Sequence, residues 1–135
     1  MGVQVAREAS VTDEEIGALR ATVGWDHEPG TYDRVLKGVY TYFVARDGER
    51  LVGFVSVISD GVADAFLVDL IVHPDYQNRG IGAQLVKNAV RYAKSLGIQC
   101  VQVTFNKENE DFYRKCGFHI FGGGIIDFKT MEVAL

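Results

Sequence analysis

Two glycines separated by one residue, Gly80 and Gly82, stand where an apolar run gives way to a helical pattern. A helix N-terminus presents backbone N–H groups that have no intrahelical partner, and the helix dipole adds roughly half a positive charge there. Because glycine has no Cβ, an anion can approach this backbone closely. The neighbouring Arg79 adds a cation. These residue types in this order predict a binding site for a phosphate group.

Three known phosphate loops compete for this segment. The P-loop pattern GxxxxGK[ST] is absent from the chain. A dinucleotide fingerprint GxGxxG needs a third glycine where Leu85 stands, and the following strand has no acidic residue for a ribose. The third pattern, [QR]-x-x-G-x-[GA], is matched at every position by Gln77-Asn78-Arg79-Gly80-Ile81-Gly82. On these residues alone, a helix start that binds no ligand remains an alternative.

Further segments strengthen the third match. They are Leu70 to Tyr76, which leads into the loop, and later Asn106, the aromatic pair Phe112-Tyr113 and Gly117-Phe118. In order and spacing, the segments resemble the GNAT (GCN5-related N-acetyltransferase) superfamily. The resemblance covers the chain from Phe66 to Phe121 and departs from the family at Asn109, where alanine is frequent.

The resemblance implies a single N-acetyltransferase domain over residues 1–135, with an α/β fold in which helices flank a mixed central sheet. It also implies acetyl-CoA as the co-substrate. The pantetheine arm is expected along the exposed edge of the central strand, and the pyrophosphate at the N–H groups of Arg79 to Ala83. The implied binding residues are Leu70, Ile71, Val72, Gln77, Asn78, Arg79, Gly80, Ile81, Gly82, Ala83, Asn106 and Tyr113. For Asn106, a plain helix N-cap is an equal alternative.

The reaction implied by the family is direct transfer of an acyl group from a thioester sulfur to an amine. Tyr113 matches the family's general acid, which protonates the departing thiolate, and its ordinary pKa of about 10 keeps it protonated at neutral pH. A core tyrosine on an amphipathic helix is the alternative for Tyr113. A backbone N–H near Val72 is expected to stabilise the charge that develops on the carbonyl oxygen.

Asp69 is the candidate base, because it stands in an otherwise apolar strand where a carboxylate is costly. Structural pairing of Asp69 with an arginine is an equal alternative. In the loop before the second helix, His27 and Glu28 either line the acceptor site or are solvated, and the second reading is favoured. His73, which precedes Pro74 at a strand end, is expected to be structural.

Composition limits the classes of function. The length of 135 residues indicates one domain, and the net charge of −4 argues against a nucleic-acid partner. Cys100 and Cys116 form no CxxC and have no nearby histidine pair, so two small buried thiols are expected and no metal site. The chain shows no signal-peptide pattern and no apolar run of about 20 residues, so a cytoplasmic protein without a membrane partner is expected.

Apolar periodicity predicts the elements that position these residues. Strands are expected at 3–6, 41–45, 51–58, 65–72, 100–104, 118–121 and 125–133, and helices at 12–24, 32–37, 80–96 and 107–115. Residues 12–15, Thr-Asp-Glu-Glu, form a capping box. The strand at 65–72 is almost wholly apolar, so it is expected to be central and buried on both faces. With the next helix and strand it predicts a right-handed βαβ unit. An exposed final strand also allows pairing into a homodimer.

Two hypotheses for function remain at this point. The first is an acetyl-CoA-dependent N-acetyltransferase that acts on a primary amine of a small molecule or a protein. The second is a catalytically idle acyl-CoA-binding module that senses or regulates. Tyr113 favours the enzyme, because binding alone needs no acid.

Overall fold

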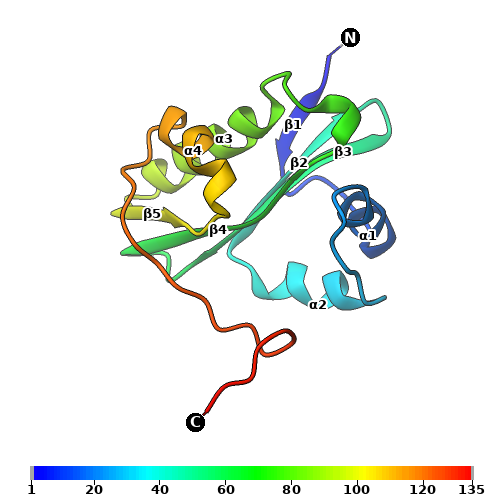
Figure 1. Cartoon of the computed structure of the whole chain (residues 1–135). Coiled ribbons are helices and arrows are strands. Elements are labelled where there is room, and N and C mark those ends of the chain that lie inside the picture. Colours follow the sequence, from blue (N-terminus) through cyan, green and yellow to red (C-terminus); the bar gives the residue numbers. More distant parts are fainter. Residues whose placement is uncertain (1, 135) are drawn as a thin grey trace. The chain divides into compact units, whose positions relative to one another are not determined.

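Five strands form one mixed sheet in the computed structural model, which describes residues 2–134 (Figure 1). The strands are β1 (Gln4–Arg7), β2 (Thr41–Asp47), β3 (Arg50–Ser59), β4 (Asp64–Val72) and β5 (Cys100–Val103). They lie in chain order across the sheet, with antiparallel pairing from β1 to β4 and parallel pairing between β4 and β5. The mixed sheet and the antiparallel pair at 41–58 were predicted and are confirmed. The sheet and its first three helices form one compact unit that ends at Val103, and a second unit begins at Thr104.

Two helices cover one face of the sheet, α1 (Asp13–Thr22) and α2 (Thr31–Gly38) (Figure 1). The predicted capping box forms at the start of α1, where Thr12 Oγ1 accepts from the N–H of Glu15 at 3.1 Å and the Thr12 N–H donates to Glu15 Oε1 at 3.0 Å. The apolar side of α1 then packs against the sheet. The buried core on this face consists of Ile16, Leu19, Tyr32, Val44, Leu51, Phe54 and Ile71.

Helix α3 (Ile81–Ser95) covers the opposite face (Figure 1). Phe43 and Val44 are neighbours on β2, so their side chains point to opposite faces. Val44 belongs to the core beneath α1, whereas the ring of Phe43 packs edge-on against Tyr92 of α3, with 6.2 Å between the ring centroids. Because β4 and β5 are parallel, β4, α3 and β5 form the predicted βαβ unit.

The buried centre of the sheet is β3, whereas the sequence had indicated β4. The side chains from Leu51 to Val57 are all buried, but β4 leaves Phe66 41% exposed. Strand β4 lies next to the edge strand, and its pairing with β5 stops at Leu67 and Val103. An apolar run therefore marked a strand correctly but not its place in the sheet.

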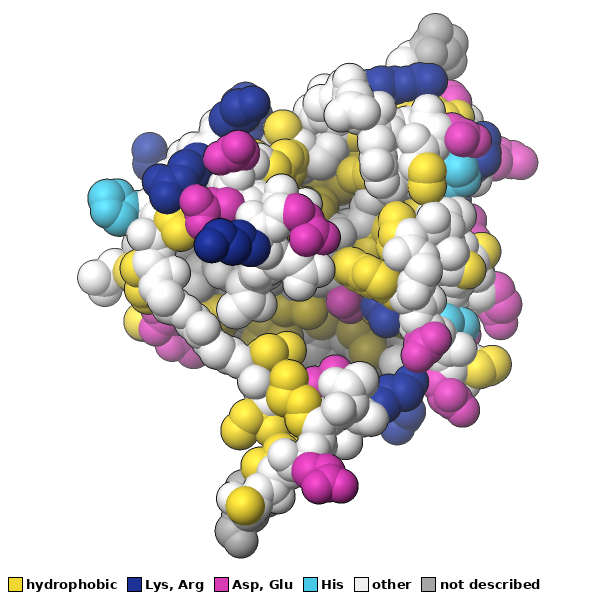
Figure 2. All heavy atoms as spheres, viewed as in Figure 1, with side chains coloured by type: hydrophobic (Ala, Val, Ile, Leu, Met, Phe, Trp, Pro, Cys, Tyr) yellow, Lys and Arg dark blue, Asp and Glu magenta, His cyan; other side chains and the backbone are white. Residues whose placement is uncertain are grey.

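The second unit contains a 3₁₀ turn, η2 (Lys107–Asn109), and helix α4 (Glu110–Lys115). The two strands predicted at 118–121 and 125–133 are wrong, because the described residues there form no strand. The segment instead exposes Phe121, Ile125 and Phe128 by 78%, 72% and 77%, and Figure 2 shows hydrophobic side chains along this C-terminal stretch. Apolar alternation reports side chains that fit a sheet, but a strand also needs a hydrogen-bonded partner. Pairing of two chains through this segment remains a prediction.

The prediction that both cysteines are buried is also wrong. Cys100 is exposed at the start of the edge strand β5, and Cys116 is partly exposed. Within residues 2–134, no group of three or more potential metal ligands comes together. Over the same residues, no helix has the length and apolar character needed to cross a bilayer.

Candidate active site

The carboxyl end of β4 has one unpaired edge. Pairing with β5 ends at Leu67, so within the described residues no strand adjoins Leu70 to Val72 on that side. On the other side, the N–H of His73 donates to Val52 O of β3 at 2.8 Å. Successive residues of a strand direct their N–H and C=O groups to opposite sides, so those of Val72 face the unpaired edge. The Val72 N–H is therefore a donor on an edge that has room for an extended ligand, and its expected role at the carbonyl oxygen stays a prediction.

The loop that follows is fixed by side chains. Gln77 donates from Nε2 to Val72 O at 3.0 Å, so its amide joins the loop to the end of β4. Between them, the 3₁₀ turn η1 (Pro74–Tyr76) buries the ring of Tyr76, and the guanidinium of Arg79 lies over that ring at 5.0 Å. The first residue of the glycine motif thus has a clear local role in bracing the loop.

The start of α3 fits an anion. Asn78 and Gly80 have positive φ angles of 64° and 81°, and Gly80 is the N-cap but offers no side chain to cap the helix. A Cβ placed on Gly80 would meet no atom within 4 Å, so the backbone there faces open space. The N–H groups of Ile81, Gly82 and Ala83 belong to this first turn, where no intrahelical acceptor is available. The residues present therefore match a pyrophosphate held by backbone N–H groups.

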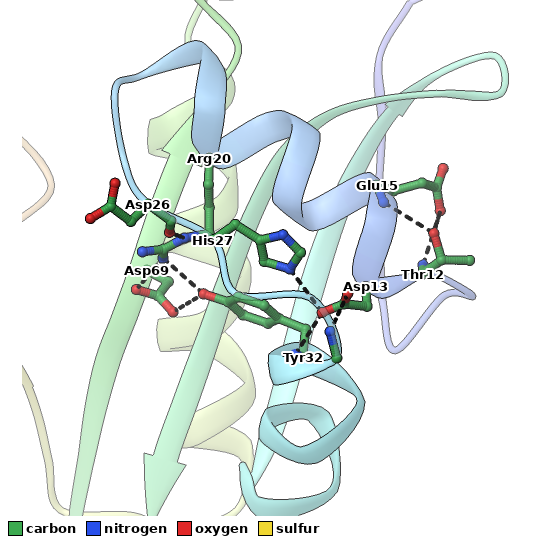
Figure 3. Close-up of polar contacts among 9 residues, drawn as sticks. Thr12, Asp13, Glu15, Arg20, Asp26, His27, Tyr32 and Asp69 are labelled. Carbon is green, nitrogen blue, oxygen red and sulfur yellow. Dashed lines mark hydrogen bonds and ion pairs between the residues drawn. The ribbon is translucent and has the colours of Figure 1, made fainter.

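Asp69 lies at a β-bulge of β4. Phe54 pairs with Ile71 and Ser56 with Val68, so Val55 stands opposite two residues, Asp69 and Leu70. The carboxylate of Asp69 accepts a hydrogen bond from the Tyr32 hydroxyl at 2.6 Å, and its second oxygen lies 3.5 Å from the Arg20 guanidinium (Figure 3). The arginine pairing considered for Asp69 is thus observed. With 25% of its side chain exposed, the carboxylate also remains accessible.

Tyr113 and Asn106 belong to the second unit. The ring of Tyr113 is buried among Phe105, Phe112 and Phe118, with centroid distances of 5.0, 4.9 and 5.7 Å. Burial raises the pKa of Tyr113 to about 12, and Cys116 adds to the shift. Its hydroxyl forms no hydrogen bond within residues 2–134, so this protonated phenol can donate to a ligand.

The plain capping role considered for Asn106 is not supported. Asn106 precedes η2, but its side chain makes no capping hydrogen bond, and the residue is exposed. Among residues 2–134 its amide has no hydrogen-bond partner, so it is available for the ligand contact that the family resemblance implies. Asn109, the position that departs from the family, is the N-cap of α4 and likewise makes no side-chain cap.

The other candidates divide between structural and solvated roles. His27 was expected to be solvated, but Nε2 lies 2.9 Å from Asp13 Oδ1 and only 17% of the side chain is exposed. Glu28 is exposed, as expected. His73 is structural, as predicted, because Nδ1 accepts from the N–H of Asp75 at 3.1 Å and so caps η1.

Three residues of the site were missed, Asp13, Arg20 and Tyr32. Asp13 was noted only within the capping box, and Tyr32 only as the start of a helix. Tyr32 and Asp69 are 37 positions apart, and no local pattern connects residues at such a separation. The sequence signal for this cluster was the carboxylate of Asp69 in an apolar strand. A buried carboxylate needs a partner, but the sequence does not show which residue the partner is.

Comparison with known proteins agrees with this geometry. Residues 9–118 match the Acetyltransferase (GNAT) family, and the chain therefore belongs to this family. A GNAT-family acetyltransferase of Streptococcus pneumoniae shares 30% identity, with a TM-score of 0.79 over 94% of this chain and 99% of that chain. The ribosomal-protein-S18-alanine N-acetyltransferase of Escherichia coli has the same fold, with 15% identity and a TM-score of 0.75 over 87% of this chain and 78% of that one.

Curated relatives match over a smaller share of their own length. An uncharacterized N-acetyltransferase of Methanocaldococcus jannaschii is 31% identical over 86 residues, which is 57% of this chain and 38% of that protein. Another, from Pyropia yezoensis, is 27% identical over 109 residues, which is 77% of this chain and 63% of that protein. The chain thus spans less than two thirds of the length of these curated relatives.

Proposed function

We propose that this protein is an N-acetyltransferase that uses acetyl-CoA and acts on a primary amine of a small molecule or a protein. The observation that carries the proposal is the unpaired end of β4 followed directly by an uncapped helix start. Together they offer an extended edge and an anion site in one continuous stretch, Leu70 to Ala83. Coenzyme A has a matching order of parts, an amide-containing arm followed by a pyrophosphate.

The binding residues divide by the chemistry they offer. Along Leu70, Ile71 and Val72, the backbone groups that face the unpaired edge pair with the amides of the arm, as those of an added strand do. The N–H groups from Arg79 to Ala83 take the pyrophosphate. Three further residues complete the set. Gln77 braces the loop and Asn78 provides its left-handed turn. Asn106 offers a side-chain amide that makes no capping hydrogen bond.

Acetyl-CoA supplies an activated acetyl group, so that a C–N bond forms as the C–S bond breaks. The attacking amine must be neutral, and Asp69 is the carboxylate in this unit that can take up or relay its proton. Val72 N–H is placed to stabilise charge on the carbonyl oxygen. Tyr113 is the acid for the thiolate, since its raised pKa keeps it protonated.

The test is an amine panel of polyamines, aminoglycosides, amino acids and short peptides with free N-termini. Free thiol released from acetyl-CoA is measured with each amine, and mass spectrometry identifies the acetylated product. We expect at least one amine to gain an acetyl group at a rate well above hydrolysis. Tight binding of acetyl-CoA without any acetylated product would instead indicate the idle binding module.

A further inference from the structure

Asp69 adopts a backbone conformation that residues other than glycine rarely take. Its φ angle is 58°, in the left-handed region, at the bulge opposite Val55. Such a residue costs free energy unless its surroundings fix it, and bulges often redirect a side chain beside a functional site. In a regular strand the side chain of Asp69 would follow the alternation of β4. At the bulge it instead lies beside α1 and α2, as Figure 3 shows.

Two side chains hold the Asp69 carboxylate. Tyr32 donates its hydroxyl proton to Oδ2 at 2.6 Å, and Arg20 Nη1 lies 3.5 Å from Oδ1. Arg20 Nη1 also donates to the Tyr32 hydroxyl at 2.9 Å, so the three groups form a closed set. Burial and the bond to Asp69 raise the pKa of Tyr32, so this phenol remains a donor throughout the pH range in which an acetyltransferase is assayed.

Arg20 is itself fixed by further contacts. Its Nε donates to the backbone carbonyl of Asp26 at 2.7 Å, and its guanidinium lies over the rings of Trp25 and Tyr32, at 5.2 and 5.8 Å. With 19% of its side chain exposed, Arg20 is well shielded from water. An arginine held in this way keeps one orientation toward its carboxylate partner.

The backbone of Tyr32 is held by Asp13, which is 4% exposed. Oδ1 of Asp13 accepts from the N–H of Tyr32 at 2.8 Å and lies 2.9 Å from His27 Nε2, while Oδ2 accepts from the N–H of Gly30 at 2.8 Å. One carboxylate therefore connects His27, within the loop that leads into α2, to the first residues of α2. Gly17 of α1 makes room for this arrangement, because a Cβ there would come within 2.3 Å of the His27 ring.

We propose that Arg20 and Tyr32 are positioning residues that hold the Asp69 carboxylate in one orientation for the incoming amine, with Asp13 as the anchor of Tyr32. This inference rests on the proposed function, in which Asp69 takes up or relays the amine proton. Among the described residues, the groups that face Asp69 are Arg20 from α1 and Tyr32 from α2. A carboxylate with only two fixed neighbours leaves lone pairs for a third partner, and a fixed orientation lowers the cost of placing that partner for reaction.

The experiment is a double-mutant cycle with Tyr32→Phe and Asp69→Asn, in which asparagine tolerates the left-handed backbone. If Tyr32 acts through Asp69, Tyr32→Phe lowers kcat roughly tenfold or more in the wild-type background, in proportion to the loss of one hydrogen bond to a charged group. In the Asp69→Asn background the same change should alter kcat less than about twofold. Coenzyme A affinity should stay the same in both backgrounds, because Tyr32 is not among the binding residues.

The matched control is Tyr42→Phe. Tyr42 and Tyr32 flank the same ring of Phe54, each with 6.1 Å between centroids, but the Tyr42 hydroxyl forms no hydrogen bond among the described residues. The kcat of Tyr42→Phe should equal that of the wild type. An equal loss of kcat in both Asp69 backgrounds, or no loss in either, would overturn the proposal, since Tyr32 would then act independently of Asp69.

Urea unfolding of the wild type, Tyr32→Phe, Asp69→Asn and the double variant needs no substrate. This measurement therefore separates the positioning role of Tyr32 from the proposed function. The Tyr32 and Asp69 changes should be non-additive in the free energy of unfolding, because Tyr32→Phe removes the donor of a hydrogen bond whose acceptor loses its charge in Asp69→Asn. If the wild type acetylates no amine, the proposed function fails, and the unfolding cycle still decides whether Tyr32 holds Asp69. Additive changes there would reject the positioning role whatever the activity.

Discussion

The two sides of the candidate active site are built in different ways. The side assigned to coenzyme A is made of backbone from one continuous stretch, Leu70 to Ala83, with its N–H groups at a strand edge and a helix start. The Asp69 side is made of side chains from α1, α2 and β4, which meet only in the folded chain. A backbone-made site tolerates changes of side chain, whereas a site made of side chains depends on each one. Substitutions of single side chains should therefore affect the Asp69 side more than the side assigned to coenzyme A.

Removing the Asp69 charge should cause the largest loss. In Asp69→Asn we expect turnover to fall by roughly 10²-fold or more, because a positioned base contributes on that scale. Coenzyme A affinity should stay the same, which separates the two sides of the site. The control is Asp64→Asn on the same strand, where Asp64 Oδ1 accepts from Gln102 Nε2 at 2.9 Å. Its turnover should stay near that of the wild type. Near-normal turnover in Asp69→Asn, with an acceptor that the wild type uses, would assign Asp69 a structural role.

Tyr113→Phe should lower turnover by roughly 10²-fold and change coenzyme A binding by less than about 1 kcal/mol, the usual net contribution of one hydrogen bond. The pKa of Tyr113 is raised to about 12, so the phenol is protonated from pH 7 to 10. The ratio of wild-type turnover to variant turnover should therefore be constant over that pH range. Tyr92→Phe on α3 serves as a control. Full activity of Tyr113→Phe at each of these pH values would leave Tyr113 as a core residue only.

Asp13→Asn should have a smaller effect, on stability. Hydrogen bonds from the N–H of Gly30 and from His27, followed by the N–H of Tyr32, lower the pKa of Asp13 to about 2. The ordinary pKa of an aspartate is about 3.9, so the stabilisation is fully present above pH 4 and is lost as pH falls toward 2. Urea unfolding should show the variant less stable at pH 7, with the difference shrinking as pH falls below 4. A difference that stays constant with pH would mean that Asp13 acts without its charge.

The sequence was most informative where structure depends on backbone. Glycines at 80 and 82, the capping box at 12–15 and the βαβ unit each follow from local chemistry, and each is present in the structure. The unpaired edge of β4 was expected only through family resemblance, because the end of a strand pairing leaves no local mark on the sequence.

The errors share one physical cause. The partners of Asp69 could not be predicted, because Arg20 and Tyr32 reach it through tertiary packing. The strands expected at 118–133 failed for a related reason, since apolar alternation cannot state whether a partner strand is present. The exposed place of Cys100 likewise follows from the position of β5 at an edge, which depends on the order of strands.

Calorimetry on two glycine variants tests whether the backbone at the start of α3 binds the pyrophosphate of coenzyme A. Gly80 and Gly97 lie at opposite ends of α3, with φ angles of 81° and 77°, and a Cβ on either would meet no atom within 4 Å. Alanine therefore adds a similar backbone strain at both positions. We predict that Gly80→Ala weakens coenzyme A binding by roughly tenfold or more, since a Cβ obstructs close approach of the anion, and that Gly97→Ala leaves it unchanged. Equal affinities in the two variants would mean that the backbone at Gly80 does not hold the pyrophosphate.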